Sequence, residues 1–127
     1  MFLHVDPANG LAIYDQILRQ IKFAVAGGVL TAGEFVPSVR ELARELAVNP
    51  NTVAKAYQLL QSEGVLEPVR GTGLAVAAGA AKRCGSERVK LLRQRLRYVL
   101  SEAKKSHIDL GELRDLLEEE WKAMEKA

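Results

Sequence analysis

The segment Val-Asn-Pro-Asn-Thr-Val-Ala-Lys-Ala-Tyr at residues 48–57 contains the start of a helix. Asn49 is a favoured N-cap residue, and Pro50 takes the first helical position, where a missing N–H group costs nothing. The helix is predicted to continue to about Glu63, because Gly64 is a typical C-terminal stop. On a helical wheel its apolar side chains gather on one side, so the opposite side presents a polar face to solvent.

The chain before this helix predicts a second helix, separated from the first by a short turn. Residues 38–41 (Ser-Val-Arg-Glu) form a capping box, in which the first side chain accepts from the amide of the fourth residue. Only residues 47–48 separate the two helices, which is the helix-turn-helix pattern. An earlier helix is predicted over residues 12–26, where isoleucine or valine recurs every four residues, and residues 34–36 favour a short strand.

The hydrophobic period changes after Gly64, from helical spacing to short apolar runs. Residues 65–69 and 74–76 are strand candidates, and residues 70–73 (Arg-Gly-Thr-Gly) form the turn between them. A β-hairpin directly after a helix-turn-helix is a wing. The following residues 77–86 are small and contain glycine, which predicts a linker or hinge.

Two further helices are predicted at the end of the chain, each with apolar residues spaced three or four apart. The first carries Val89, Leu92, Leu96, Val99 and Ala103, and the second carries Leu110, Leu113, Leu117, Trp121 and Met124. Residues 106–108 connect them, so the pair is expected to form an antiparallel hairpin. One hairpin leaves much of its apolar seam exposed, and a second copy would cover it in a four-helix arrangement. The expected dimerisation residues are Val89, Leu92, Leu96, Val99, Leu113, Leu117 and Trp121.

The predicted fold is therefore mainly α with a small β wing. A winged helix-turn-helix domain is expected over residues 1–77, a linker over 78–86 and a two-helix antiparallel dimerisation domain over 87–127. Charge is unevenly placed in the tail. Residues 82–105 carry nine basic and two acidic residues, a balance of +7, whereas residues 109–127 carry three basic and seven acidic residues, a balance of −4. These opposite charges are expected to help orient the paired helices.

Composition excludes several classes of protein. The chain has 127 residues, 48% hydrophobic and 27% charged, with a net charge of +2, which is typical of a small globular protein. It lacks both the roughly 18–20 consecutive apolar residues of a membrane span and a secretory signal, so a cytoplasmic protein is expected. Cys84 is the only cysteine, and His4 and His107 have no ligand spacing around them, so neither a metal nor another cofactor is expected. No nucleophile–base constellation or phosphate-binding glycine loop predicts an enzyme.

Several side chains of the predicted winged helix suit DNA. Asn51 and Lys55 lie on the outer face of the second helix of the helix-turn-helix, which has no acidic residue before its end. Arg40 sits in a first helical turn, where a cation opposes the helix dipole, so its position favours a function over stability. Arg70 precedes glycines that allow close approach to a phosphodiester, and arginine suits a narrow minor groove. The alternatives are a solvated helix face, an ion pair of Arg40 with a nearby glutamate such as Glu41 or Glu45, and an ordinary hairpin turn.

Three ordered motifs also resemble those of a known family. They are Phe-Val-Pro-Ser-Val-Arg-Glu-Leu-Ala (35–43), the segment at 48–57 quoted above, and Glu-Gly-Val-Leu-Glu-Pro-Val-Arg-Gly-Thr-Gly (63–73). Together they closely resemble the winged-helix domain of the GntR-family transcription regulators, over about residues 11–77. The short two-helix tail is similar to that of the YtrA-type subfamily, in which the tail mainly dimerises. The resemblance implies a homodimeric, sequence-specific repressor of its own operon, which in this subfamily often includes a membrane transporter.

The resemblance also implies a set of site residues and a partner, double-stranded DNA with a pseudo-palindromic operator. Carried over position by position, the implied DNA contacts are Ser38, Arg40, Asn49, Asn51, Thr52, Arg70 and Gly71. Lys55 is added from its helix face, and Thr72 from its place in the wing turn. Many relatives carry arginine where this chain has Pro50 and Ala54, so base preference must rest on other contacts, such as Arg40, Asn51 and Lys55, or on DNA shape.

Two other functions are compatible with these features. A winged helix can serve only as a protein-interaction module, and the near-neutral residues 1–74, with six basic and seven acidic residues, favour that alternative. The acid-free outer helix face argues against it. A small-molecule sensor is the second alternative, and because the tail helices are short, its effector would have to bind at the dimer interface or the hinge.

Overall fold

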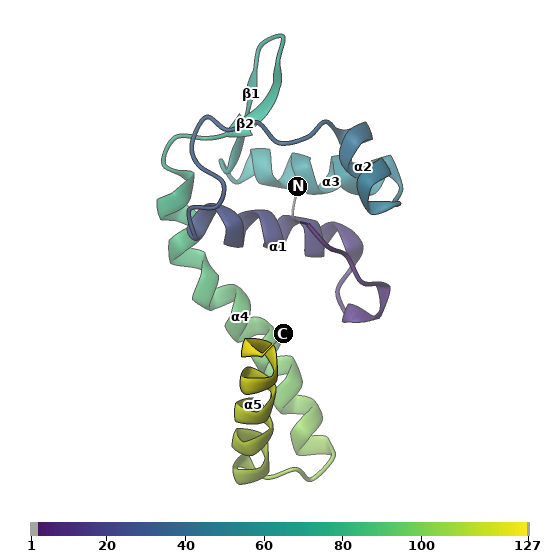
Figure 1. Ribbon diagram of the computed structural model, residues 1–127, viewed down its shortest axis with the longest axis vertical. Coiled ribbons are helices and arrows are strands. Elements are labelled where there is room, and N and C mark those ends of the chain that lie inside the picture. Colours follow the sequence, from purple (N-terminus) through teal and green to yellow (C-terminus); the bar gives the residue numbers. More distant parts are fainter. Residues whose placement is uncertain (1–2, 127) are drawn as a thin grey trace. The chain divides into compact units, whose positions relative to one another are not determined.

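The computed structural model describes residues 3–126, which form helices and one two-stranded antiparallel sheet (Figure 1). The order of elements is η1 (Pro7–Asn9), α1 (Ile13–Ala26), α2 (Val39–Leu46), α3 (Pro50–Ser62), β1 (Leu66–Val69), β2 (Gly73–Val76), α4 (Ala80–Lys105) and α5 (Leu110–Glu125). The chain divides into two compact units, Met1–Val89 and Lys90–Ala127, so the boundary between them falls within α4. The predicted fold class, mainly α with a β wing, is confirmed.

Local capping fixes the start of both helices of the helix-turn-helix. The Glu41 amide donates to Ser38 Oγ over 3.1 Å and the Ser38 amide donates to the Glu41 carboxylate over 3.2 Å, which is the predicted capping box. The Asn51 amide donates to Asn49 Oδ1 over 2.8 Å, as predicted for an N-cap residue followed by proline. Between the helices Ala47 has a φ of 55°, a left-handed conformation that turns the chain sharply.

The core of the first unit lies where three helices meet the base of the wing. In Figure 1, α1 and α3 run side by side, with α2 packed against one end of α3. Each helix contributes its apolar stripe, and both strands add the side chains nearest the helices. The most deeply buried large side chains are Ile17, Ile21, Val25, Leu42, Val53, Leu60, Leu66 and Val76. This core buries the apolar side of α3 and leaves its polar side exposed.

The wing is a hairpin with a partial third strand. Strands β1 and β2 pair antiparallel from Leu66↔Val76 to Val69↔Gly73. The predicted strand at residues 34–36 forms one isolated bridge, Phe35↔Ala75, on the other edge of β2. Because this segment runs directly into α2, the bridge connects the base of the wing to the start of the helix-turn-helix.

The prediction of a linker over residues 78–86 is wrong, because α4 begins at Ala80 and continues without a break to Lys105. Ala80 and Cys84 are buried in the core of the first unit, at 0% and 2% exposure. Small residues are common in flexible linkers, but alanine is also the best helix former and fits where a helix packs closely. Small residues were therefore wrongly interpreted as a hinge, because they form the start of a helix that packs against the core.

In the second unit, α5 turns back along the end of α4 (Figure 1), which agrees with the predicted hairpin. Asp109 accepts from the Glu112 amide over 2.9 Å and caps α5 as predicted. Of the apolar side chains here, Ala103 is buried, while α5 has no buried residue. Within residues 3–126 there is no helix with the length and apolar character needed to cross a membrane.

Candidate nucleic-acid interface

The outer face of α3 is exposed and polar, as its wheel predicted. Asn51, Lys55, Gln58 and Ser62 are exposed, whereas Val53, Ala56, Tyr57 and Leu60 are buried on the opposite side. Ala54, which the wheel also placed on the outer face, is half-buried and so contributes little to it. An exposed face with amides, a hydroxyl and an ammonium but no carboxylate can donate to phosphates and to base edges in a major groove.

Lys55 has a partner that the sequence did not predict. Its Nζ atom lies 3.9 Å from the centroid of the Tyr14 ring on α1, a cation–π contact. Tyr14 is half-buried and belongs by its spacing to the apolar stripe of α1, so only the packing of α1 against α3 brings these residues together. The contact holds the ammonium beside the start of α1 while Lys55 stays exposed.

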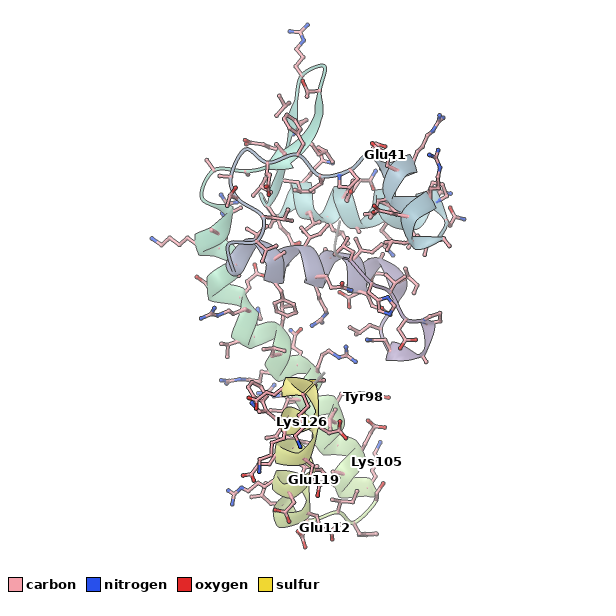
Figure 2. All side chains as sticks on the ribbon, in the orientation of Figure 1. Glu41, Tyr98, Lys105, Glu112, Glu119 and Lys126 are labelled. Carbon is pink, nitrogen blue, oxygen red and sulfur yellow. The ribbon has the colours of Figure 1, made fainter. Side chains whose placement is uncertain are left out.

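The start of α2 presents an exposed hydroxyl and an exposed cation. Ser38 and Arg40 are both exposed, and within residues 3–126 Arg40 has no ion pair. Glu41, a predicted alternative partner for Arg40, is instead hydrogen-bonded to Ser38, and these bonds lower the pKa of the Glu41 carboxyl below its usual value. Figure 2 shows Glu41 in the first turn of α2. The Arg40 guanidinium is therefore available for another anion.

The tip of the wing is a tight turn that places an arginine at its corner. The Thr72 amide donates to the Val69 carbonyl over 3.0 Å, so Arg70 and Gly71 are the central residues of a β-turn. Gly71 has a φ of +77°, which a residue with a Cβ rarely adopts. An added Cβ at Gly71 would meet nothing within 4 Å, so the turn is open to a close-approaching backbone.

An open groove of about 930 Å³ lies between the wing and the segment that leads into α2. Its lining includes Ser38 and Thr72, both predicted DNA contacts, and the acidic residues Glu34 and Glu41. Among the described residues that line it there is no lysine or arginine. The sequence placed any effector site at the dimer interface or the hinge, whereas this groove lies within the winged-helix unit.

The remaining predicted contacts, Asn49 and Thr52, lie at the start of α3. Asn49 is exposed and Thr52 is half-buried. The structure thus brings Asn49, Asn51 and Thr52 together in one helical turn, while Arg70, Gly71 and Thr72 lie at the wing.

Sequence reasoning missed a buried cation near the C-terminal end of α3. Lys22 on α1 is only 3% exposed and pairs with Glu63 and Glu87. Burial alone would lower the pKa of Lys22, but hydrogen bonds and charge from the two carboxylates outweigh it and raise the pKa above its ordinary value. The only sequence sign is a lysine next to Ile21 within an otherwise apolar helix stripe.

A helix-turn-helix with an acid-free outer helix and an arginine-tipped wing defines a winged-helix DNA-binding protein. Comparison with known proteins agrees with this class. The family model for bacterial regulatory proteins of the gntR family matches residues 13–76. The chain belongs to the GntR family, and it is a DNA-binding transcriptional regulator, not an enzyme.

Individual relatives extend the similarity into the tail. The HTH-type transcriptional repressor YtrA of Bacillus subtilis is 32% identical over 92% of this chain and 90% of its own length. The structure of YtrA from Sulfolobus acidocaldarius, a GntR-family transcription factor, is 33% identical with a TM-score of 0.59, and the match covers 80% of this chain and 99% of that one. The DNA-binding domain of AraR in complex with operator ORX1 is 27% identical with a TM-score of 0.53, over 58% of this chain and 94% of that one.

Proposed function

We propose that the chain is a cytoplasmic, homodimeric repressor of its own operon that binds a pseudo-palindromic operator. The observation that carries the proposal is the exposed, acid-free face of α3 beside an open, arginine-tipped wing. The similarity to a repressor over nine-tenths of both chains supports repression as the direction of control.

The proposed DNA contacts fall into three groups that suit three parts of a half-site. Asn51 and Lys55 reach base edges and phosphates of a major groove, together with Asn49 and Thr52. Ser38 contacts a phosphate at the start of α2, where helix amides favour anions, and Arg40 in the same turn reaches a base edge. The wing residues Arg70, Gly71 and Thr72 enter the adjacent minor groove.

Exposed apolar surface in the second unit supports a homodimer. Leu96, Leu117 and Trp121 are 51%, 64% and 66% exposed, and Val89, Leu92 and Val99 are exposed as well. Leu113, the remaining predicted dimerisation residue, is half-buried. Large contiguous apolar surface is uncommon on a monomer, so a second copy of the tail is the proposed cover. In a dimer, binding of one winged-helix domain to its half-site raises the effective concentration of the second domain at the other half-site.

Selection of bound duplexes from a random DNA pool tests the DNA-binding part of the proposal. A dimeric regulator should recover a two-fold sequence with half-sites about one helical turn, or ~10 base pairs, apart. A protein-interaction module would recover no common sequence. If the recovered sequence has a single half-site, the chain binds as a monomer and the pseudo-palindrome is wrong.

A pair of matched substitutions on α4 tests the dimer. Leu96→Glu places a charge in the proposed seam and should give a monomer in sedimentation experiments that no longer binds the selected duplex. Tyr98→Glu is the control, because Tyr98 is 69% exposed and lies outside the predicted seam (Figure 2). If both variants remain dimers, the interface lies elsewhere in the chain.

A further inference from the structure

One ion-pair cluster joins three helices of the first unit. Lys22 Nζ on α1 lies 2.8 Å from Glu63 Oε1 at the end of α3 and 3.0 Å from Glu87 Oε2 on α4. The Lys22 side chain is 4% exposed, while both glutamates are about 40% exposed, at 39% and 41%. The ammonium is therefore shielded from water, and its two carboxylates fix it from different helices.

A second contact ties α4 to the same end of α3. One nitrogen of the Arg83 guanidinium donates to the carbonyl oxygens of Glu63 and Gly64, over 3.2 and 3.0 Å. These carbonyls lie at the C-terminal end of a helix, where backbone acceptors lack intrahelical partners and a cation is favoured. An added Cβ on Gly64 would lie 1.8 Å from this nitrogen, so the approach depends on glycine there.

The two contacts lie on the docked face of α4. Ala80 and Cys84 are buried on the first unit, and Arg83 and Glu87 lie within one turn of Cys84. Burying an ion pair often stabilises a fold no more than a well-packed apolar cluster would, whereas its directional hydrogen bonds can specify one arrangement. The ionic contacts of Lys22 and Arg83 therefore favour a role in setting the direction of the first turns of α4 against α1 and α3.

We propose that this clamp, formed by Lys22, Glu63, Arg83 and Glu87, determines which half-site spacing the regulator accepts. The inference rests on the proposed homodimer. The clamp holds the C-terminal end of α3 to the start of α4. The proposed DNA contacts lie on α3 toward its other end, and α4 continues to the proposed dimer residues Leu92 and Leu96. These four are positioning residues and need not touch DNA.

The scale of the effect follows from helix geometry. About 12 residues separate Glu87 from Val99, or ~18 Å at a rise of 1.5 Å per residue. A change of about 10° in the direction of α4 at the clamp would move a point at that distance by ~3 Å, close to the ~3.4 Å rise of one base pair. One base pair also rotates a half-site by roughly 34–36° around the DNA axis. A loosened clamp should therefore reduce, without abolishing, the loss of affinity for half-sites one base pair closer or further apart.

The test measures affinity for duplexes that carry the selected half-sites at the selected spacing and with one base pair inserted or removed. The wild-type protein should lose about tenfold or more in affinity at each altered spacing, a loss of the size that one mismatched base pair causes. Arg83→Ala and Glu87→Gln should reduce this loss to about threefold or less, because the helix direction is no longer fixed. Arg88→Ala is the matched control, since Arg88 is an exposed arginine on the same helix outside the clamp, and it should keep the wild-type profile.

The ratio of affinities at different spacings distinguishes a change in helix orientation from a loss of folding stability. A variant that is only destabilised would bind all the duplexes more weakly by the same factor. Folded, dimeric variants that keep the wild-type spacing profile would overturn the clamp inference and leave the homodimer intact. A wild-type protein that is monomeric, or indifferent to spacing, would overturn both. Lys22→Met serves as a third variant, and its folding is checked by circular dichroism before its profile is compared.

Discussion

At the scale of single residues, the proposed DNA contacts differ in how the free protein holds them. Arg40 is exposed and without an ion pair in the described chain, whereas Lys55 rests 3.9 Å from the Tyr14 ring centroid. Releasing Lys55 to a phosphate would cost a cation–π contact of about 0.5–1 kcal/mol at an exposed site. Arg40 has no such contact to lose among the described residues. Substitution of Arg40 should therefore report its contribution to DNA binding more directly than substitution of Lys55 would.

Substitution of Arg40 should therefore weaken operator binding. Arg40→Ala is expected to lower affinity for the selected duplex by about 1–3 kcal/mol if the guanidinium reads a base, measured by fluorescence anisotropy at fixed salt. Arg44→Ala, an exposed arginine in the last turn of the same helix, is the control and should bind as the wild-type protein does. Equal losses in the two variants would show a general charge effect and no specific contact at Arg40.

The position of Arg70 at the tip of the wing predicts that binding depends on the width of the minor groove. Arg70→Ala should weaken binding more on operators flanked by A·T pairs than on operators flanked by G·C pairs, because a narrow minor groove concentrates negative potential. Competition experiments with the two duplexes measure the difference directly. If the loss is the same on both, Arg70 contacts only phosphates.

The raised pKa of Tyr57 leads to a prediction of how folding stability changes at alkaline pH. Its hydroxyl donates to the Pro37 carbonyl over 2.7 Å, and burial, with smaller effects of Glu41 and Glu45, raises its pKa above the ordinary value of 10. Above about pH 10 the unfolded chain releases this proton and the folded chain keeps it, so the free energy of unfolding falls as pH rises. Lys22, whose pKa is also raised, acts in the same direction.

Tyr57→Phe should separate these effects. At pH 8 the variant should be less stable by about 0.5–1.5 kcal/mol, because the hydrogen bond to Pro37 is lost. Between pH 8 and pH 11 it should lose less stability than the wild-type protein, because Tyr57 no longer contributes and only the raised pKa values of Lys22 and Cys84, among the shifted groups named here, still make stability fall with pH. Urea unfolding at both pH values measures this, and parallel losses in the two proteins would contradict the assignment.

At the scale of elements, the turn between α2 and α3 contains a strained residue, because alanine takes a backbone conformation there that favours glycine. Ala47 adopts a φ of 55° at the end of α2, a position where glycine is usually found. Its amide donates to the carbonyls of Ala43 and Arg44, so the conformation satisfies the end of the helix. The short turn sets the angle between the two helices of the helix-turn-helix, and alanine holds it at some energetic cost.

Ala47→Gly should therefore stabilise the protein. A gain of about 0.5–1 kcal/mol is expected, since relief of the left-handed conformation exceeds the entropy that glycine adds to the unfolded chain. Ala54→Gly, inside α3, is the control and should cost about 1 kcal/mol in unfolding free energy. Urea unfolding measures both, and a loss of stability in Ala47→Gly would show that the φ of Ala47 is not strained.

At the scale of the whole molecule, α4 belongs to both compact units. Its first turns complete the core of the winged-helix unit through Ala80 and Cys84, and its later turns carry exposed apolar residues such as Leu96. Burial in the nonpolar core also raises the pKa of the Cys84 thiol. The functional boundary therefore lies after residue 89, and a cut at residue 77 would remove part of a core.

Two truncations test this boundary. Residues 1–89 should fold as a monomer with a cooperative urea transition. Residues 1–77 should be less stable by about 2–4 kcal/mol, because the surface under Ala80 and Cys84 is exposed and Lys22 loses one of its carboxylates. If both fragments unfold at the same urea concentration, α4 contributes nothing to the winged-helix core.

Features that depend on residues within one helical turn could be predicted from the sequence. The caps at Ser38, Asn49 and Asp109, the glycine at the end of α3 and the strands of the wing all follow from local hydrogen bonding and backbone preference. Hydrophobic spacing also identified the buried side of α3, and with it the exposed face on which Asn51 and Lys55 lie. Whether those residues contact DNA stays a prediction.

Contacts between distant segments could not be predicted in this way. Lys22 is 41 residues from Glu63 and 65 residues from Glu87, so no local pattern could pair them. The small residues 78–86 suit a linker and a closely packed helix equally well, and the core that buries Ala80 and Cys84 selects the helix. Caps and turns are stabilised within a few residues, whereas buried ion pairs and close helix packing depend on surroundings that other parts of the chain provide.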